Sequence, residues 1–313
     1  MIIHATSIHS GGGKVLLDQL LLEKKFGPIN ILICDERYIL PIAIDSSTNI
    51  YRVKPSLISR WKAEVLLKRL SGSNPKNTVL CFSNLPPAFK LKSNVVLYLQ
   101  NALLIPGIPL YASSIKVALR LIYERVWSRI FWKNIDEVWV QTEWMKNALS
   151  KSGKPVNIKP FLPTLPEATQ TKKKYDFITI SGTSKHKRLT ELLSAWDLFS
   201  DRSAPSLLVV TDGTNEKYDK IFQHLESKNV SVKIGASREE IFNYYQVSKA
   251  LLVTSKLESF CLPIYEAAHF KLKIFGVNEP YSRDSGLLDG YIDLSSAESA
   301  KSSIENNFQK FSL

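Results

Sequence analysis

The sequence has few cysteines, and their spacing matches no metal-binding pattern. Cys34, Cys81 and Cys261 are too few and too widely separated for a disulfide framework or a zinc site. The start, Met-Ile-Ile-His, lacks the basic segment with which a secretory signal begins, so we expect no signal peptide. The most apolar stretch, residues 95–112, is interrupted by two prolines, a glycine and two amide side chains, and it is a poor transmembrane helix. We therefore expect a soluble protein of a reducing compartment.

Acidic residues are scarce in the first half of the chain. Of the 41 Lys and Arg and the 29 Asp and Glu, residues 1–165 hold 22 and 10, a net charge of 22 − 10 = +12. Residues 166–313 hold 19 and 19, a net charge of zero. This asymmetry indicates two domains with different partners, and it predicts a polyanion or an anionic membrane near the first one. The hydrophobic share of 44% excludes a disordered chain.

Short continuous apolar runs alternate with helical patterns along both halves. Runs such as 2–6 and 29–34 are typical of strands in a parallel sheet covered on both faces. Strand–helix alternation of this kind predicts a doubly wound α/β domain. Four prolines between residues 154 and 174 interrupt the pattern, which restarts with a strand predicted at 176–181.

We therefore divide the chain into an N-terminal domain of residues 1–165 and a C-terminal domain of residues 166–300. Residues 301–313 have a helical pattern, and one possibility is that this C-terminal helix packs back on the N-terminal domain.

The most informative segment covers residues 250–269. A predicted strand ends near Ser255, at the carboxyl edge where open α/β sheets bind ligands. A helix is predicted from Pro263, because proline is favoured at the first helical position. The backbone N–H groups of Phe260, Cys261 and Leu262 then lie at the positive end of this helix and suit a phosphate.

Two carboxylates flank that helix start. Glu258 stands in the loop before the helix, and Glu266 stands about one turn inside it. Each could take a pair of sugar hydroxyls. The alternative is a solvated loop or capping residue for Glu258 and an exposed helix residue for Glu266, and spacing alone favours this alternative.

Residues 258–267, Glu-Ser-Phe-Cys-Leu-Pro-Ile-Tyr-Glu-Ala, resemble the Glu-Gly-Phe-Gly-Leu-Pro-x-x-Glu-Ala signature of a glycosyltransferase family. This family is the retaining GT-B enzymes with a Glu-x7-Glu motif (glycosyl transferases group 1, bacterial surface-polysaccharide type). Residues 137–146, 185–196 and 235–245 resemble further segments of it in the same order. The resemblance implies an α/β GT-B fold of two Rossmann-like doubly wound domains facing across a cleft. The N-terminal domain would bind the acceptor and the C-terminal domain the nucleotide sugar.

The resemblance also implies roles for individual residues. Glu258 would contact the donor-sugar hydroxyls, and Glu266 would hold the ribose hydroxyls. The amides near Ser259 and those of the following three residues would receive the diphosphate or the sugar. Lys187 would neutralise the leaving diphosphate, which makes Lys187 and Glu258 the implied catalytic pair. The alternative for Lys187 is an exposed lysine of a basic loop. No Asp-x-Asp motif is present, so no metal and no cofactor is implied, and a UDP- or GDP-linked sugar is the substrate.

The chain departs from the family pattern at three places near this site. The family arginine before the lysine is missing, and two replacements are open: either Lys185 takes its place, or Thr183 and Ser184 donate hydrogen bonds instead. Ser259 and Cys261 stand where the signature has glycines, although only glycine freely adopts a positive φ. Cys261 is either a thiol of low pKa at a helix start or a small packed residue.

In the first domain, a triple glycine follows the first predicted strand and opens a helix. Gly12, Gly13 and Lys14 lack the lysine spacing of a Walker A loop, but they resemble the glycine loop that faces the cleft in GT-B enzymes. The alternative is a flexible turn. Gln100, followed by Asn101, takes the place of a family histidine, and glutamine has no titratable group with which to act as a base. The acceptor proton would then pass to the departing phosphate.

The pattern of residues 115–132 predicts a long basic helix that carries two tryptophans and a phenylalanine among its aromatic residues. Its aliphatic side chains follow helical spacing, which favours either a buried stripe with solvated charges or a basic–aromatic surface at a membrane. We expect Arg120, Arg125 and Arg129 to contribute to the second arrangement. The stripe consists of Ile115, Leu119, Ile122, Val126 and Ile130, and the two tryptophans and the phenylalanine are Trp127, Trp132 and Phe131.

The resemblance thus implies a metal-independent, retaining hexosyltransferase of polysaccharide biosynthesis, such as O-antigen or capsule synthesis. Its acceptor would be an anionic lipid-linked oligosaccharide or polysaccharide. The protein would be cytoplasmic and peripheral at the inner face of the cytoplasmic membrane. One alternative is a catalytically inactive GT-B-fold protein that binds nucleotide sugars or glycans. Nucleic-acid binding through the basic half is a third possibility, but the stacking motifs of known RNA modules are missing, and we expect no nucleic-acid partner.

Overall fold

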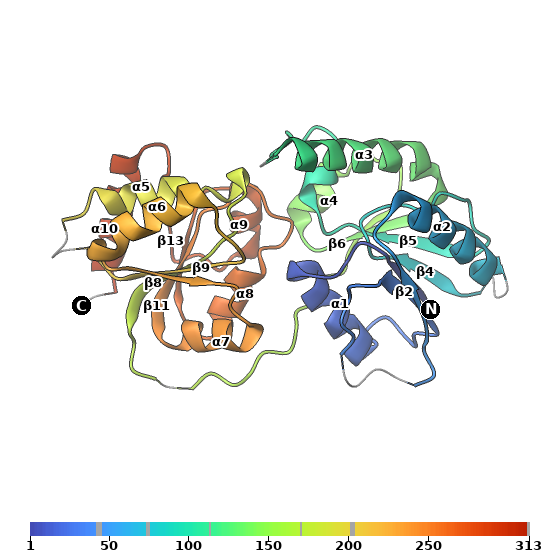
Figure 1. The fold of residues 1–313 in the computed structure, drawn as a ribbon, viewed down its shortest axis with the longest axis horizontal. Coiled ribbons are helices and arrows are strands. Elements are labelled where there is room, and N and C mark those ends of the chain that lie inside the picture. The colour runs from blue at the N-terminus through green and yellow to red at the C-terminus, as the bar shows by residue number, and fades with distance from the viewer. Residues whose placement is uncertain (42–45, 73–75, 113, 170, 201–203, 312–313) are drawn as a thin grey trace. The chain divides into compact units, whose positions relative to one another are not determined.

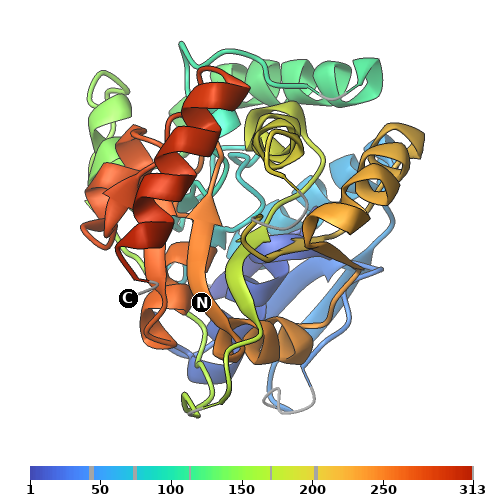
Figure 2. The same ribbon diagram turned by 90° about the vertical axis from the view of Figure 1, so that its left-hand side faces the viewer.

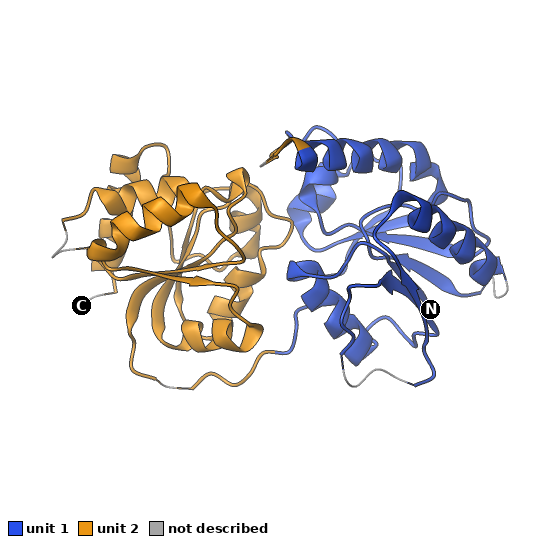
Figure 3. Ribbon diagram, viewed as in Figure 1, with its two compact units in different colours: residues 1–110, 116–164 blue, residues 111–115, 165–313 orange. Residues whose placement is uncertain are grey.

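The computed structural model describes residues 1–41, 46–72, 76–112, 114–169, 171–200 and 204–311, which form two compact units (Figures 1 and 3). Unit 1 comprises residues 1–110 and 116–164, and unit 2 comprises residues 111–115 and 165–313. The main division falls between Thr164 and Leu165, beside the boundary predicted after residue 165.

Each unit contains one parallel sheet with helices around it. The elements through residue 158 are β1 (Ile2–Ala5), α1 (Gly11–Glu23), β2 (Ile31–Asp35), β3 (Asn49–Val53), α2 (Leu57–Gly72), β4 (Thr78–Cys81), β5 (Asn94–Tyr98), η1 (Ala102–Leu104), α3 (Ile115–Phe131), η2 (Trp132–Asn134), β6 (Glu137–Val140), α4 (Glu143–Ala148) and β7 (Val156–Ile158). The remaining elements are β8 (Tyr175–Ile180), η3 (Lys185–Lys187), α5 (Leu189–Asp197), β9 (Leu207–Thr211), α6 (Glu216–Leu225), η4 (Glu226–Lys228), β10 (Val230–Ile234), α7 (Arg238–Gln246), β11 (Ser248–Val253), α8 (Leu262–His269), β12 (Lys273–Gly276), α9 (Pro280–Ser285), β13 (Gly290–Tyr291) and α10 (Ala297–Gln309).

The two sheets share one strand order over six strands, and the sheet of unit 1 has a seventh strand at its edge. The strand order is β3-β2-β1-β4-β5-β6-β7 in unit 1 and β10-β9-β8-β11-β12-β13 in unit 2, and the paired strands run parallel. In both sheets the chain reverses its winding beside the first strand, between β1 and β4 and between β8 and β11. Such a reversal is where doubly wound sheets bind ligands, at the carboxyl ends of the strands. The predicted α/β fold of two Rossmann-like domains is confirmed.

Two strands and one α-helix escaped the sequence analysis because they lack a buried apolar run. β3 is an edge strand whose first residues are exposed, so its side chains are not uniformly apolar. β13 has only two residues. α9 begins at Pro280, and Glu279 and Ser282 form a reciprocal cap at its start, a pattern that short polar helices share with turns.

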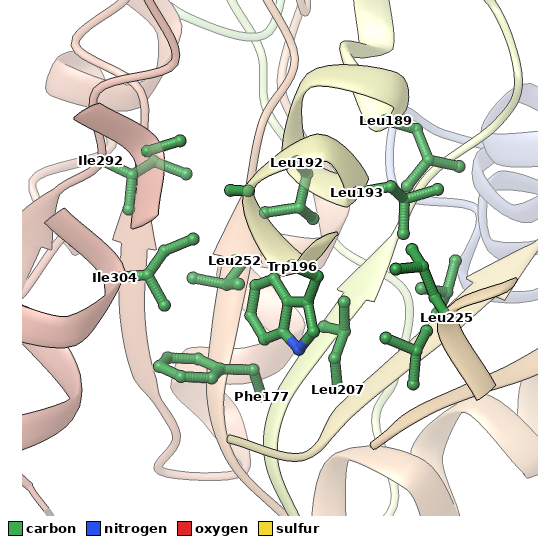
Figure 4. Close-up of a cluster of buried hydrophobic side chains, with 14 of the residues drawn as sticks. Phe177, Leu189, Leu192, Leu193, Trp196, Leu207, Leu225, Leu252, Ile292 and Ile304 are labelled. Carbon is green, nitrogen blue, oxygen red and sulfur yellow. The ribbon is translucent and has the colours of Figure 1, made fainter. Parts of the chain in front are cut away.

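Helix α10 packs on the core of unit 2, and the return of residues 301–313 to the N-terminal domain stays a prediction. Residues 312 and 313 lie outside the described part. Ala300 and Ile304 of α10 are buried in one cluster with Phe177 of β8 and Trp196 of α5 (Figure 4). The rings of Phe177 and Trp196 meet edge to face with centroids 5.9 Å apart. Figure 2, which faces this unit, shows α10 in red beside the strands. Its apolar stripe is therefore needed to complete the core of unit 2.

Helix α3 turns a face to solvent that the sequence analysis had considered for the core. Its buried residues are Leu121, Trp127 and Ser128, whereas the five aliphatic residues of the predicted stripe are all exposed. Arg125 is also not a surface charge, because its guanidinium donates hydrogen bonds to the carbonyl oxygens of Leu103 (2.6 and 2.8 Å) and Ile108 (2.6 Å). Among the described residues, no helix combines the length and the apolar character that a membrane span requires.

A buried histidine of the first strand lies beside a buried glutamate of α2, and neither ring nitrogen of the histidine has a hydrogen-bond partner within the described part of the chain. His4 of β1 is fully buried, and its Nε2 lies 3.6 Å from Oε1 of Glu64. Glu64 also accepts hydrogen bonds from Arg60 Nε (3.0 Å) and from the backbone N–H of Ala88 (2.9 Å). Burial lowers the pKa of His4 from 6.5 to about 4, with a further lowering by Arg60, against the opposing effect of Glu64. His4 is therefore neutral in the folded protein near pH 7.

This histidine should make the stability of unit 1 fall in mild acid. Above pH 6.5 neither the folded nor the unfolded state binds the proton, but below it only the unfolded state does so until about pH 4. The pKa difference corresponds to a loss of about 3 kcal/mol in the free energy of unfolding as the pH falls through that window. Urea denaturation from about pH 7 to about pH 4.5 measures it. The variant His4→Gln, which cannot titrate there, should have a flatter profile, and equal slopes would contradict the assignment.

Candidate functional site

The candidate site in unit 2 is built from loops at the winding reversal of its sheet. The loop after β8 runs from Ser181 to Lys187, and the loop after β11 runs from Thr254 to Cys261. Because β8 and β11 are neighbouring parallel strands, the two loops leave the same edge of the sheet side by side. Segments 67 or more residues apart in the sequence are thereby brought together, as the hydrogen bond from Thr254 Oγ1 to the carbonyl oxygen of Lys187 (2.6 Å) shows.

These loops pair the two residues that the sequence analysis named as catalytic. Nζ of Lys187 donates a hydrogen bond to Oε1 of Glu258 in an ion pair whose side chains are 26% and 18% exposed. Burial alone would lower the pKa of Lys187, but the carboxylate of Glu258 outweighs it and raises the pKa overall, with a smaller contribution from Asp212. Lys187 therefore carries a positive charge at the carboxyl ends of β8 and β11. It is not the freely solvated loop residue of the alternative interpretation.

Hydrogen bonds hold the residues before and after Lys187 in place. The N–H of Lys256 donates to the carbonyl oxygen of His186 (2.7 Å), next to the bond from Thr254. Arg188 adopts a left-handed backbone conformation (φ 53°), which ends the short helix η3, and its guanidinium donates to the carbonyl oxygen of Leu294. These contacts limit the positions that the ammonium group can reach.

The other predicted residues of this loop are less constrained by side-chain contacts. Lys185 is exposed, and Thr183 and Ser184 are half-buried. The carbonyl oxygen of Ser184 accepts a hydrogen bond from the N–H of Lys187 (2.8 Å), so this serine contributes to η3 through its backbone. A Cβ at Gly182 would lie 3.3 Å from Oδ1 of Asp212, which places Asp212 against this loop. The sequence analysis did not identify Asp212, although it directly follows strand β9.

Glu266 is a buried carboxylate with two fixed partners. It is 1% exposed, its Oε2 accepts a hydrogen bond from the hydroxyl of Tyr245 (2.9 Å), and its Oε1 lies 2.7 Å from Nη1 of Arg238. The exposed helix residue of the alternative interpretation is thus excluded. Both partners stand on α7, seven positions apart and hence on one face of the helix, a spacing from which they could have been identified.

The start of α8 carries strain that glycine would avoid. Cys261 is the N-cap residue of this eight-residue helix and has φ 59°, a conformation that costs a non-glycine residue about 1 kcal/mol or more. Burial raises the pKa of its thiol above the ordinary value, so the structure supports a packed neutral thiol and not a thiolate. The ring of Phe260 stacks on that of Tyr265 with centroids 4.2 Å apart, which holds the residues before the helix against its first turn. Ser259 precedes Phe260 in the chain and Leu262 follows Cys261, and both side chains are half-buried.

In unit 1, the structure brings together two of the five residues predicted for the acceptor side. A Cβ at Gly13 would lie 3.1 Å from Ile8 and 3.9 Å from Oε1 of Gln100. This oxygen is buried without a hydrogen-bond partner, whereas Nε2 of Gln100 donates to the carbonyl oxygen of Phe82 (3.2 Å). Gly12 precedes Gly13 in the first turn of α1 and is exposed.

The remaining two residues have local roles. Nζ of Lys14 lies 2.5 Å from Oδ2 of Asp18, one turn along the same helix. The side chain of Asn101 caps η1 by accepting a hydrogen bond from the N–H of Leu103 (3.0 Å). Across the described residues, no three His, Cys, Asp or Glu side chains gather as a group that could hold a metal ion.

Comparison with known proteins connects unit 2 to one family. Residues 164–285 match the family model described as glycosyl transferases group 1. No curated protein sequence matches the chain.

Solved structures resemble the chain over most of its length. WaaG, a glycosyltransferase involved in lipopolysaccharide biosynthesis, is 13% identical over 98% of this chain and 90% of its own, with a TM-score of 0.68. HepE from Anabaena, solved with UDP and glucose, is 10% identical over 99% and 88%, with a TM-score of 0.62. TarM from S. aureus is 15% identical over 80% of this chain and 52% of its own, with a TM-score of 0.59, so the chain spans about half the length of TarM. At these identities the likeness shows the fold, which is that of the GT-B glycosyltransferases.

Proposed function

We propose that the protein is a glycosyltransferase that uses a nucleotide-diphosphate sugar as its donor. The observation that carries the proposal is the pairing of Lys187 with Glu258 at the winding reversal of the unit 2 sheet, with the buried Glu266 on the adjoining helix. A positive charge and two carboxylates match the two halves of such a donor, a diphosphate and hydroxyl-bearing rings. The group 1 family match over these residues and the UDP held by HepE support the same class of ligand.

In this proposal, donor binding rearranges the ion pair between Lys187 and Glu258. An incoming diphosphate competes with Glu258 for the ammonium group of Lys187, since both are anions. Once Lys187 turns to the phosphate, the carboxylate of Glu258 is free to accept hydrogen bonds from sugar hydroxyls. Each oxygen of Glu266 has one protein partner and retains a lone pair for a ribose hydroxyl.

In the transfer itself, the bond between the sugar C1 and the phosphate oxygen breaks, and a bond from C1 to the acceptor oxygen forms. We propose that the acceptor proton passes to the departing phosphate on the same face, which retains the anomeric configuration. Lys187 and the N-terminal end of α8 stabilise the leaving diphosphate, so the reaction as we propose it uses neither a metal nor a cofactor. A UDP- or GDP-linked hexose is the donor in this proposal.

For the acceptor we propose a hydroxyl of a lipid-linked oligosaccharide or polysaccharide, reached from the cytoplasmic side of the membrane. The net charge of +12 in residues 1–165 supports an anionic carrier, because the donor residues lie in the half with no net charge.

Donor turnover by the purified full-length chain tests the proposal. We expect release of UDP or GDP from at least one nucleotide sugar of a panel, and faster release when a lipid-linked or polysaccharide acceptor is added. Calorimetry on the same panel measures binding separately. Binding without turnover, and with no effect of Glu258→Gln, would favour the inactive nucleotide-sugar-binding protein, and neither binding nor turnover would refute the donor assignment.

A further inference from the structure

Helix α3 carries an uninterrupted aliphatic stripe on its solvent face. Ile115, Leu119, Ile122, Val126 and Ile130 are 81%, 62%, 45%, 50% and 56% exposed. At 3.6 residues per turn these five positions fall within about 80° of the helix circumference, so they form one continuous strip over four turns. We call these five residues the α3 stripe. A continuous apolar strip of this length on a protein surface indicates a site that contacts another protein or a membrane.

The opposite face of α3 is anchored, so the helix cannot simply rotate to bury the stripe. Leu121 is fully buried, and Trp127 donates a hydrogen bond from Nε1 to the carbonyl oxygen of Pro86 (2.8 Å). The ring of Trp127 also lies under the guanidinium of Arg60, 5.6 Å from its centroid. The hydrogen bonds of Arg125 hold the loop before α3 in place as well.

Positive side chains border the stripe. Lys116, Arg120 and Arg129 of α3 are exposed, and so is Lys133, two residues after the end of the helix. The single acidic residue of the helix, Glu124, is half-buried, and its Oε1 lies 3.6 Å from Nε of Arg120. If Arg125, which is bound to backbone carbonyls, is counted as well, α3 has four basic residues and one acidic residue, a net charge of 4 − 1 = +3.

We propose that the α3 stripe inserts into the surface of an anionic lipid membrane, with the bordering lysine and arginine side chains at the headgroups. Aliphatic side chains between cationic ones are the pattern of helices that lie in a membrane interface. A second copy of this chain fits less well, because two such stripes packed together would bring their basic borders into contact without acidic partners. The inference concerns where the protein works, and it does not depend on the glycosyltransferase proposal.

Vesicle sedimentation with the full-length chain tests this inference. We use vesicles of phosphatidylcholine alone and of phosphatidylcholine with an equal amount of phosphatidylglycerol. The wild-type chain should sediment with the anionic vesicles, and Ile122→Ser combined with Val126→Ser should lower its partition coefficient about tenfold or more. Lys116→Gln combined with Arg129→Gln should lower binding to the anionic vesicles as well. Leu198→Ser removes an aliphatic residue that is 43% exposed in unit 2 and is the matched control, with binding unchanged.

Two further measurements separate the possible outcomes. Thermal unfolding should give the same midpoint for the wild-type chain and the stripe variant, so a loss of vesicle binding is not a loss of folding. Sedimentation equilibrium without lipid detects self-association. A dimer that the stripe substitutions dissociate would assign the stripe to a second copy and overturn the proposal. Equal vesicle binding by the wild-type and stripe-variant chains would overturn it too.

Discussion

Replacement of Lys187 by alanine should lower the turnover of the nucleotide sugar by about 10²- to 10³-fold, the usual cost of removing one group that stabilises a developing anion. The backbone of Lys187 is held near the carboxyl end of β8, because the hydroxyl of Thr254 donates to its carbonyl oxygen and the N–H of Lys256 donates to the carbonyl oxygen of His186. We therefore expect no other cation to take the place of its ammonium group. The effect should appear mainly in kcat, because the negative charge on the diphosphate grows as the bond to the sugar breaks.

The matched control is Lys220→Ala, which removes an exposed lysine of the same unit from a pair with Glu216. This control should retain wild-type turnover. Lys187→Ala also leaves Glu258 without its cationic partner, so thermal unfolding and calorimetry with UDP must accompany the kinetics. A folded Lys187→Ala chain with wild-type kcat would show that the ion pair is structural and that the leaving group is stabilised elsewhere.

The position of Lys187 next to Glu258 illustrates what the sequence predicts well. The apolar runs of β8 and β11 identify them as buried parallel strands, and their order in a doubly wound sheet makes them neighbours. Residues that follow two such strands must lie at one edge of the sheet. The ion pair itself depends on side-chain directions within two irregular loops, and neither composition nor spacing encodes these directions.

Helix α3 illustrates the opposite case. The stripe has the spacing of a core-facing helix, yet the buried face is formed by Leu121 and Trp127 on the other side. Hydrophobic periodicity identifies an amphipathic helix, but a helix with two apolar faces does not show which of them the rest of the chain covers. Here the tertiary contacts decide, above all the hydrogen bond from Trp127 to Pro86 and the position of Arg60 over the same ring.

Replacement of Arg238 by methionine should destabilise unit 2 by about 3 kcal/mol, because it leaves the carboxylate of Glu266 buried without its cation. The side chain of Glu266 is 2% exposed, and its second partner, the hydroxyl of Tyr245, supplies a hydrogen bond but no charge. The apolar stem of methionine can still pack on the ring of Phe242, over which the guanidinium now lies at 4.6 Å, so the loss should be mainly electrostatic. Hydrogen exchange of peptides from α7 and α8 measures the local free energy of opening in the full-length chain.

The double variant Arg238→Met with Glu266→Gln separates a lost charge pair from lost packing. Glutamine keeps the shape of the side chain and an acceptor for Tyr245 while removing the charge, so the double variant should regain a large part of the stability that Arg238→Met alone loses. Lys220→Met, which disrupts an ion pair whose side chains are 73% and 85% exposed, should change stability by less than about 0.5 kcal/mol, since exposed pairs contribute little. If the double variant is no more stable than Arg238→Met, then Arg238 acts through its packing on Phe242, and Glu266 does not depend on its charge. If it is more stable, the loss in Arg238→Met is that of a buried carboxylate left without its cation, and Arg238 stabilises unit 2 through its charge on Glu266.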